Sequence, residues 1–226
     1  MKLHVIKPSV NNMTVRVFVR AAGISVEEVD AYGQTRSDAF LKLCPAHATP
    51  LLEGPDVPGG ALWESCAIMQ FLCNDKGLTQ FYPDAAAARA KQDSAMLYHT
   101  GTFYPLVARA VYPALGFPLY PGEVGASDAS DAEKEVARQS AEDALADPLA
   151  VFGGCYIGNG DFIGGASPSI ADIRLSSTLE FLAAIDYALP GRIATYKAAV
   201  EDALGEAYTE PAADVRGYIA YVKSQK

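Results

Sequence analysis

The chain has 226 residues, of which half are hydrophobic and a fifth are charged, and its formal net charge is −9. This length allows one large domain or two modest ones, each with a buried core. The negative charge argues against nucleic-acid binding and against peripheral membrane binding, because both depend on clustered Lys and Arg. No apolar run is long enough to span a bilayer, and the N-terminus does not have the pattern of a signal peptide, so we expect a cytoplasmic protein.

The first 77 residues predict alternating strands and helices. Strands are expected over 3–7, 25–32, 50–53 and 60–64, and helices over 13–22, 37–44 and 65–77. Gly23 and Gly77 are typical helix ends, and Ser37 is a typical helix cap. This order fits a compact mixed α/β domain with a four-stranded sheet.

From about residue 84 the pattern becomes entirely helical. Helices are expected over 84–117, 130–152, 169–189 and 192–204, with the first bent or broken near Gly101 and Pro105. We therefore expect an α/β domain over 1–78, a short linker, and an all-helical domain over 84–226.

Small polar residues gather where the first strand meets the first helix. Ser9, Asn11 and Asn12 stand directly before an apolar run. They could cap the helix through its unpaired backbone N–H groups. Alternatively, a helix N-terminus with a hydroxyl beside it is suited to holding an anion, and a thiolate is one.

The stretch "HATPLLE" places a proline at the start of a strand. A cis peptide bond at Thr49–Pro50 would turn the N–H and C=O of Thr49 outward, where they could pair with another peptide backbone. An ordinary trans proline is the other interpretation.

The stretch "WESCAI" places Glu64 and Ser65 at a helix start. They could be a cap and an exposed acid placed favourably against the helix dipole. In a functional reading, Ser65 and the helix N-terminus bind a carboxylate while Glu64 takes an ammonium group, as an α-amino acid would require.

The four cysteines and three histidines give no sign of a metal site or a disulfide framework. The cysteines, at positions 44, 66, 73 and 155, have no C-x-x-C spacing. We expect no structural metal, and we interpret Cys66 as a packing residue.

Together these features resemble the cytosolic glutathione transferase family, over essentially the whole chain. "FLKLCPAHATPLLE" resembles the family stretch that ends in a cis-proline, and "LWESCAI" resembles its Glu-Ser motif for the γ-glutamyl group. "SPSIADIRLS" resembles its helix-capping signature, with Ser169 as cap and Asp172 three residues on. The resemblance implies a thioredoxin-like N-terminal domain followed by an all-α C-terminal domain.

The resemblance also implies which residues form the site. Ser9 falls in the column of the activating residue of theta-like and delta-like enzymes, where a hydroxyl donates to the glutathione sulfur, and Asn11 falls near the sulfur. The glutathione-binding residues implied are His47, Ala48, Thr49, Pro50, Glu64 and Ser65. A free thiol is only about 3% thiolate at pH 7, and lowering its pKa to about 6.5 needs about 2.7 kcal/mol.

The second substrate would be a hydrophobic electrophile bound along the helix that follows Gly101. Tyr104, Val107 and Tyr112 fall where the delta-like enzymes line this pocket, with Tyr98 and Tyr120 as weaker candidates. Aromatic residues at this spacing can equally be core residues.

Three functions are compatible with these observations. The first is a homodimeric glutathione transferase that conjugates hydrophobic electrophiles in detoxification. The second is a glutathione-dependent isomerase, ether-cleaving enzyme or peroxidase on the same scaffold, since Asn11 and Asn12 replace the usual Pro-containing turn. The third is a non-catalytic interaction module, against which Ser9 and the Glu64-Ser65 pair argue.

Overall fold

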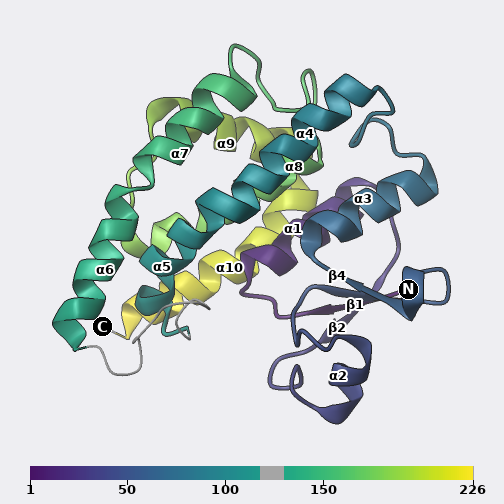
Figure 1. Ribbon diagram of the computed structural model, residues 1–226, viewed down its shortest axis with the longest axis horizontal. Coiled ribbons are helices and arrows are strands. Elements are labelled where there is room, and N and C mark those ends of the chain that lie inside the picture. The colour runs from purple at the N-terminus through teal and green to yellow at the C-terminus, as the bar shows by residue number, and fades with distance from the viewer. Residues whose placement is uncertain (118–129, 226) are drawn as a thin grey trace.

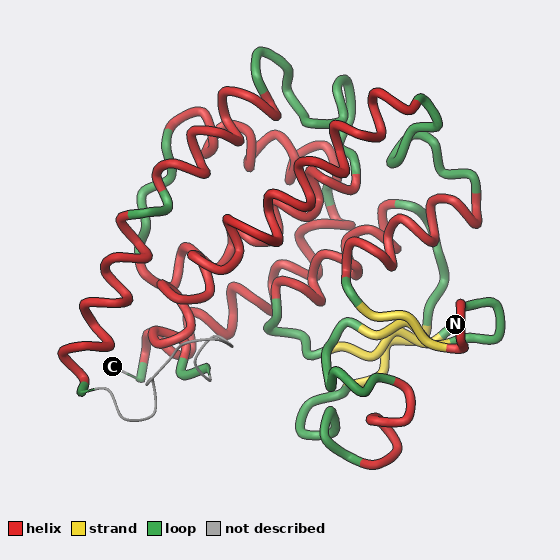
Figure 2. The backbone as a smooth tube through the Cα atoms, in the orientation of Figure 1, coloured by secondary structure: helices red, strands yellow, loops and turns green. Residues whose placement is uncertain are grey.

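The computed structural model describes residues 1–117 and 130–225. A small sheet-containing part at the N-terminal end lies beside a larger bundle of helices (Figure 1). Figure 2 shows that the described strands gather in one place, with helices around them. The weaker candidate Tyr120 lies outside the described residues.

The four strands form one mixed sheet in the order β2-β1-β3-β4. The strands are β1 (Lys2–Val5), β2 (Glu27–Asp30), β3 (Leu51–Glu53) and β4 (Ala61–Trp63). The β1 strand pairs in parallel with β2, whereas the β1–β3 and β3–β4 pairs are antiparallel. The expected four-stranded mixed α/β arrangement is therefore confirmed.

Three helices cover this sheet and give it a thioredoxin-like architecture. They are α1 (Val10–Ala21), α2 (Asp38–Leu43) and α3 (Ser65–Lys76). In Figure 1, α1 and α3 lie on one face of the sheet and α2 lies on the other. As expected, Ser37 caps α2 by accepting a hydrogen bond from the Phe40 N–H, and Gly77 ends α3 in the left-handed conformation.

The rest of the described chain is helical. Its elements are α4 (Ala86–Tyr98), η2 (His99–Phe103), α5 (Tyr104–Leu115), α6 (Asp131–Asp143), α7 (Ala146–Val151), η3 (Phe152–Ile157), α8 (Ile170–Leu179), η4 (Glu180–Ile185), α9 (Gly191–Leu204) and α10 (Glu206–Ser224). Every residue of α8 is buried, because this helix packs against α1, α3, α4 and α9. One hydrophobic core runs through both parts of the molecule.

Several predicted helix bounds are wrong. The first helix begins at Val10 rather than Met13, so Asn11 lies inside its first turn. The helix expected over 84–117 is interrupted by the π-helical turn η2, near the expected break. The helix expected over 130–152 is divided between α6 and α7, and the one expected over 169–189 continues beyond α8 as the 3-10 turn η4.

The last helix, α10, was missed. It contains Pro211 and Gly217, both poor residues for a helix interior. Its packing against α1 stabilises it nonetheless, with the buried Arg16 of α1 donating to Asp214 over 2.8 Å and to Glu28 over 3.0 Å. Burial alone would raise the pKa of Glu28, but hydrogen bonds from Arg16 and Arg20 outweigh it and leave this pKa lowered.

The start of α8 is held by a buried carboxylate. Asp172 accepts hydrogen bonds from the backbone N–H and the hydroxyl of Ser169, at 2.8 and 2.7 Å, which confirms the predicted partnership of these two residues. It also accepts from the N–H groups of Ile163 and Gly164 and from the Tyr196 hydroxyl. Burial, together with the Asp172 carboxylate, raises the pKa of Tyr196 well above its usual value.

Candidate functional site

The N-terminus of α1 lies where β1 ends and the helical bundle begins. Ser9 is the residue before the helix, and its side chain makes no capping bond to it. Its hydroxyl is half-buried, and no partner for it occurs among the residues that the structure describes. The Ser9 hydroxyl is therefore available to a ligand beside the N–H groups of the first turn.

Asn11 joins this helix to the helical bundle. Its Nδ2 donates to the Tyr104 hydroxyl at 2.9 Å, and its Oδ1 accepts from Nη1 of Arg174 at 2.6 Å. The Tyr104 hydroxyl is also 2.8 Å from the Tyr112 hydroxyl. Because a guanidinium can only donate, Arg174 fixes which end of the Asn11 amide faces Tyr104.

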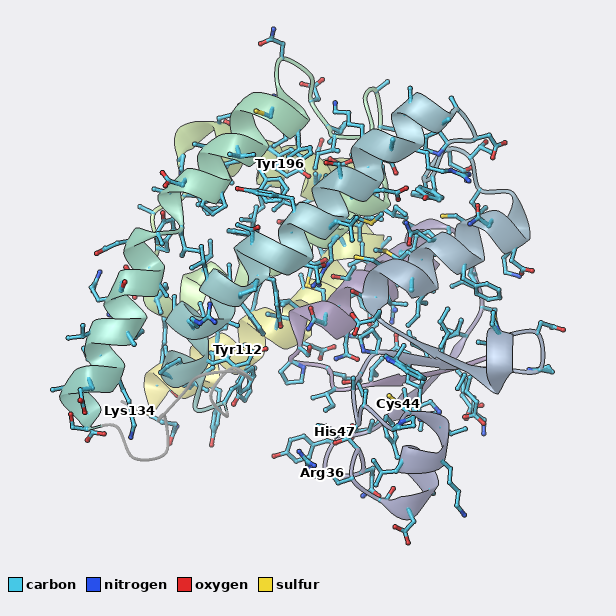
Figure 3. The ribbon with its side chains drawn as sticks, in the orientation of Figure 1. Arg36, Cys44, His47, Tyr112, Lys134 and Tyr196 are labelled. Atoms are coloured by element: carbon cyan, nitrogen blue, oxygen red, sulfur yellow. The ribbon has the colours of Figure 1, made fainter. Side chains whose placement is uncertain are left out.

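The N-terminus of α1 forms one wall of the candidate site, and the loop before β3 forms a second. The Thr49–Pro50 peptide bond is cis, which confirms the cis alternative, and Asn12 donates to the Thr49 hydroxyl at 3.1 Å. His47 is exposed and has a positive φ of 44°. Figure 3 shows His47 in the loop beside α2, whereas Tyr112 lies on α5 in the helical bundle.

The N-terminus of α3 forms a third wall. Ser65 is its first residue and is buried, while the preceding Glu64 is exposed and has a φ of 72°. This unusual backbone conformation for a non-glycine residue turns the chain sharply from β4 into α3. Glu64 thus offers an exposed carboxylate directly beside the helix N-terminus.

These three walls enclose one cavity of about 240 Å³. Its lining residues come from α1, the loop before β3, the start of α3, the α4–α5 junction and α8: Asn11, Ala48, Thr49, Pro50, Glu64, Ser65, Thr100, Tyr104 and Arg174. Seven of these nine are predicted site residues. The structure thus brings together segments that are far apart in the sequence.

Four predicted site residues are not among the residues lining this cavity. Ser9 stands two residues before the lining Asn11, and His47 directly precedes the lining Ala48. Tyr112 contacts the cavity wall through the Tyr104 hydroxyl. Val107 is fully buried in the core.

Sequence reasoning missed two lining residues, Thr100 and Arg174. Arg174 is only 4% exposed, and its guanidinium lies 5.1 Å from the centroid of the Tyr104 ring. The signal that could have found it is a charged residue within "SIADIRLSSTL", an otherwise uncharged stretch after Asp172. An arginine is almost never fully buried unless it is paired, so its position on a buried helix points to a partner.

Two nearby groups are held in their neutral forms. Burial raises the pKa of the Cys66 thiol, against the opposing field of Arg174, which agrees with its packing against the core. Burial, assisted by Arg174, lowers the pKa of His99 well below its usual value. We therefore assign neither group the role of a nucleophile or a charged ligand.

Two further findings concern the same described part of the chain, residues 1–117 and 130–225. No group of three or more His, Cys, Asp or Glu side chains is arranged to hold a metal ion there. No helix there combines the length and apolar character needed to cross a bilayer.

The sheet topology, the cis-proline loop and the attached helical bundle define a two-part thioredoxin-like architecture with a cavity at its junction. Residues 1–74 match the family model described as the glutathione S-transferase N-terminal domain. Human glutathione S-transferase theta-1 is 28% identical over 190 residues, which cover 81% of this chain and 73% of that protein. The chain is therefore similar to cytosolic glutathione transferases of the theta and delta classes, and its first 74 residues match their N-terminal domain.

Solved structures of this family share the fold along the whole chain. A delta-class glutathione transferase from Nilaparvata lugens is 24% identical, with a TM-score of 0.76, and the match covers 98% of this chain and 99% of that one. Human glutathione transferase theta-2, in complex with glutathione and an unknown ligand, is 21% identical with a TM-score of 0.76, covering 100% and 91%. These structures bear out the glutathione transferase fold.

Proposed function

We propose that this protein is a glutathione transferase, which binds glutathione as co-substrate and adds its thiolate to a hydrophobic electrophile. The observation that carries the proposal is the single cavity that joins the first turn of α1, the Thr49–Pro50 loop and the Glu64-Ser65 pair. These are the groups that a γ-glutamyl peptide with a reactive thiol requires. We propose the same division of labour for the two domains, 1–78 for glutathione and 84–226 for the electrophile.

Glutathione would lie along the N-terminal side of the cavity. Its γ-glutamyl ammonium would pair with Glu64, and its γ-glutamyl carboxylate would accept from Ser65 and the first turn of α3. The backbone of Thr49 would pair with the cysteinyl residue. Its glycyl carboxylate would extend out of the cavity toward the exposed His47.

The thiolate would lie at the N-terminus of α1. Lowering the thiol pKa from about 8.5 to about 6.5 requires about 2.7 kcal/mol of thiolate stabilisation. A hydroxyl or amide donor at this helix N-terminus can contribute stabilisation of that size. Ser9 is the proposed donor, because its hydroxyl has no described partner that a thiolate would have to displace. Asn11 is the second candidate, although its amide is already engaged by Tyr104 and Arg174.

The electrophile would approach from the helical side. Tyr104 forms the wall that it would touch, and Tyr112 orients the Tyr104 hydroxyl. Val107, fully buried one turn after Tyr104, would support this wall from behind. Attack then forms a C–S bond, while the leaving group departs or the electrophile's double bond takes up the electron pair.

The proposal is tested by glutathione calorimetry and by conjugation of chlorodinitrobenzene, with the wild type, Ser9→Ala, Asn11→Ala and Ser140→Ala. Ser140 is an exposed serine on α6 and serves as the matched control. We expect Ser9→Ala to bind glutathione but to lose most of its rate and most of its thiolate absorbance near neutral pH, while Ser140→Ala resembles the wild type.

Other outcomes would redirect the assignment. If Ser9→Ala is fully active and Asn11→Ala is not, then Asn11 is the donor, and the glutathione-dependent isomerase or peroxidase alternative gains support. If the wild type does not bind glutathione, the enzyme hypothesis fails and a non-catalytic interaction module replaces it. Light scattering of the purified protein tests the proposed homodimer.

A further inference from the structure

Arg174 is a buried cation with no anionic partner in the described residues. It is 4% exposed, and its described polar partners are neutral: Asn11 Oδ1 at 2.6 Å and the Thr14 hydroxyl at 3.5 Å, both accepting from Nη1. Among the described residues, its buried Nε has no hydrogen-bond partner, and no carboxylate lies within 4 Å of its guanidinium. The side chain nevertheless lines the cavity.

Another buried arginine of this protein shows what the usual arrangement is. Arg16 is 1% exposed and is surrounded by acidic side chains, with Glu28 at 3.0 Å and Asp214 at 2.8 Å. A buried charge without such partners is strongly unfavourable. Arg174 is therefore suited to pairing with the anionic group of a ligand, whereas Arg16 belongs to an ion pair within the protein.

The position of Arg174 indicates which substrate brings that anion, on the premise that the proposed function is correct. Each charged group of glutathione already has a partner, namely Glu64, Ser65 with the start of α3, the start of α1, and His47. Arg174 comes from α8 in the helical bundle, and its guanidinium lies over the ring of Tyr104, the residue that the electrophile is expected to touch. We therefore assign Arg174 to the binding of the second substrate.

We propose that Arg174 is an anion subsite for the electrophile, and that this protein prefers electrophiles bearing a carboxylate. A guanidinium presents a planar fork of N–H donors, which matches the two oxygens of a carboxylate. Asn11 holds this fork in place through Nη1, and the Tyr104 ring supports its flat face. The electrophile would place its reactive carbon toward the thiolate and its carboxylate toward α8.

A matched pair of substrates tests this preference: 4-chloro-3-nitrobenzoate and its neutral amide, 4-chloro-3-nitrobenzamide. In both reactions the glutathione thiolate forms a bond to the ring carbon that carries chlorine, and chloride leaves with the bonding electrons. The thiol proton goes to the buffer, and the carboxylate or amide is unchanged. Each kcat/KM is divided by the rate of the uncatalysed reaction in the same buffer, which removes the difference in electrophilicity.

The quantity compared is the ratio of the benzoate value to the benzamide value in the wild type and in variants. We expect a wild-type ratio of about tenfold or more, because charge-assisted hydrogen bonds are strong in a buried site. The ratio should fall to near one in Arg174→Gln and keep an intermediate value in Arg174→Lys. Arg138→Gln, which removes an arginine on the surface of α6, should keep the wild-type ratio.

A wild-type ratio near one would overturn the proposal. So would an Arg174→Gln variant that lowers both rates equally, since Arg174 would then act on glutathione. If circular dichroism shows that Arg174→Gln does not fold, the wild-type and Arg174→Lys ratios decide in the same way.

Calorimetry separates this proposal from the broader one. If the wild type binds no glutathione, the proposed function fails, and the subsite is tested alone with 4-nitrobenzoate and 4-nitrobenzamide. Binding of the benzoate only, and its loss in Arg174→Gln, would support the subsite. Equal binding of both compounds, or none of either, would overturn it.

Discussion

Replacing Asp172 by Asn should destabilise the protein strongly, because its carboxylate accepts hydrogen bonds from five donors, four of them buried. One oxygen accepts from the Ile163 N–H and the Tyr196 hydroxyl, and the other from the Gly164 N–H and both donors of Ser169. An asparagine retains only one oxygen, so at least two donors lose their acceptor. A hydrogen bond to a charged group contributes about 1.5–3 kcal/mol, which gives a loss of about 3–6 kcal/mol.

This loss is a large fraction of the roughly 5–15 kcal/mol that stabilises a typical domain. The measurement is urea unfolding followed by circular dichroism, comparing Asp172→Asn with Asp202→Asn. Asp202 is exposed on α9, so its substitution should change the free energy of unfolding by less than about 0.5 kcal/mol. A loss below about 1 kcal/mol for Asp172→Asn would refute the reasoning that this carboxylate holds the start of α8.

Two further predictions concern His99, near the site, and Gly164, in the loop before α8. Burial and Arg174 lower the pKa of His99, so below pH 6.5 the unfolded chain takes up a proton that the folded protein does not. The free energy of unfolding should therefore fall as the pH drops from 6.5 to 5, by up to about 1.4 kcal/mol per pH unit. His99→Gln should lessen this slope in urea titrations, and equal slopes would contradict the assignment. Gly164→Ala should lower the melting temperature, since a Cβ there would lie 2.7 Å from the Cβ of Ser169. In the control Gly154→Ala, the new Cβ meets no atom within 4 Å, so the melting temperature should hardly change. Equal changes in melting temperature for the two variants would contradict the prediction and show that the loop before α8 adapts.

The N-terminal domain could be predicted well because its signals are local. The order of strands and helices, the Ser37 cap and the Gly77 helix end each depend on neighbouring residues, and the structure has them in the expected order and places. The helical domain was less predictable at its helix ends. The π-helical turn at His99–Phe103 and the helix containing Pro211 depend on packing against other elements, which overrides local propensity.

The same division applies to the site. The sequence by itself indicated the resemblance to glutathione transferases, the order of the elements and the segments at Ser9, Thr49–Pro50 and Glu64-Ser65, since these are contiguous motifs. Only the tertiary structure decided that Asn11 faces Tyr104, that Val107 is buried away from the cavity, and that Arg174 reaches it from 163 residues along the chain. The physical reason is that the sequence does not show whether a buried charge has an oppositely charged neighbour. That neighbourhood is defined only once distant helices have packed together.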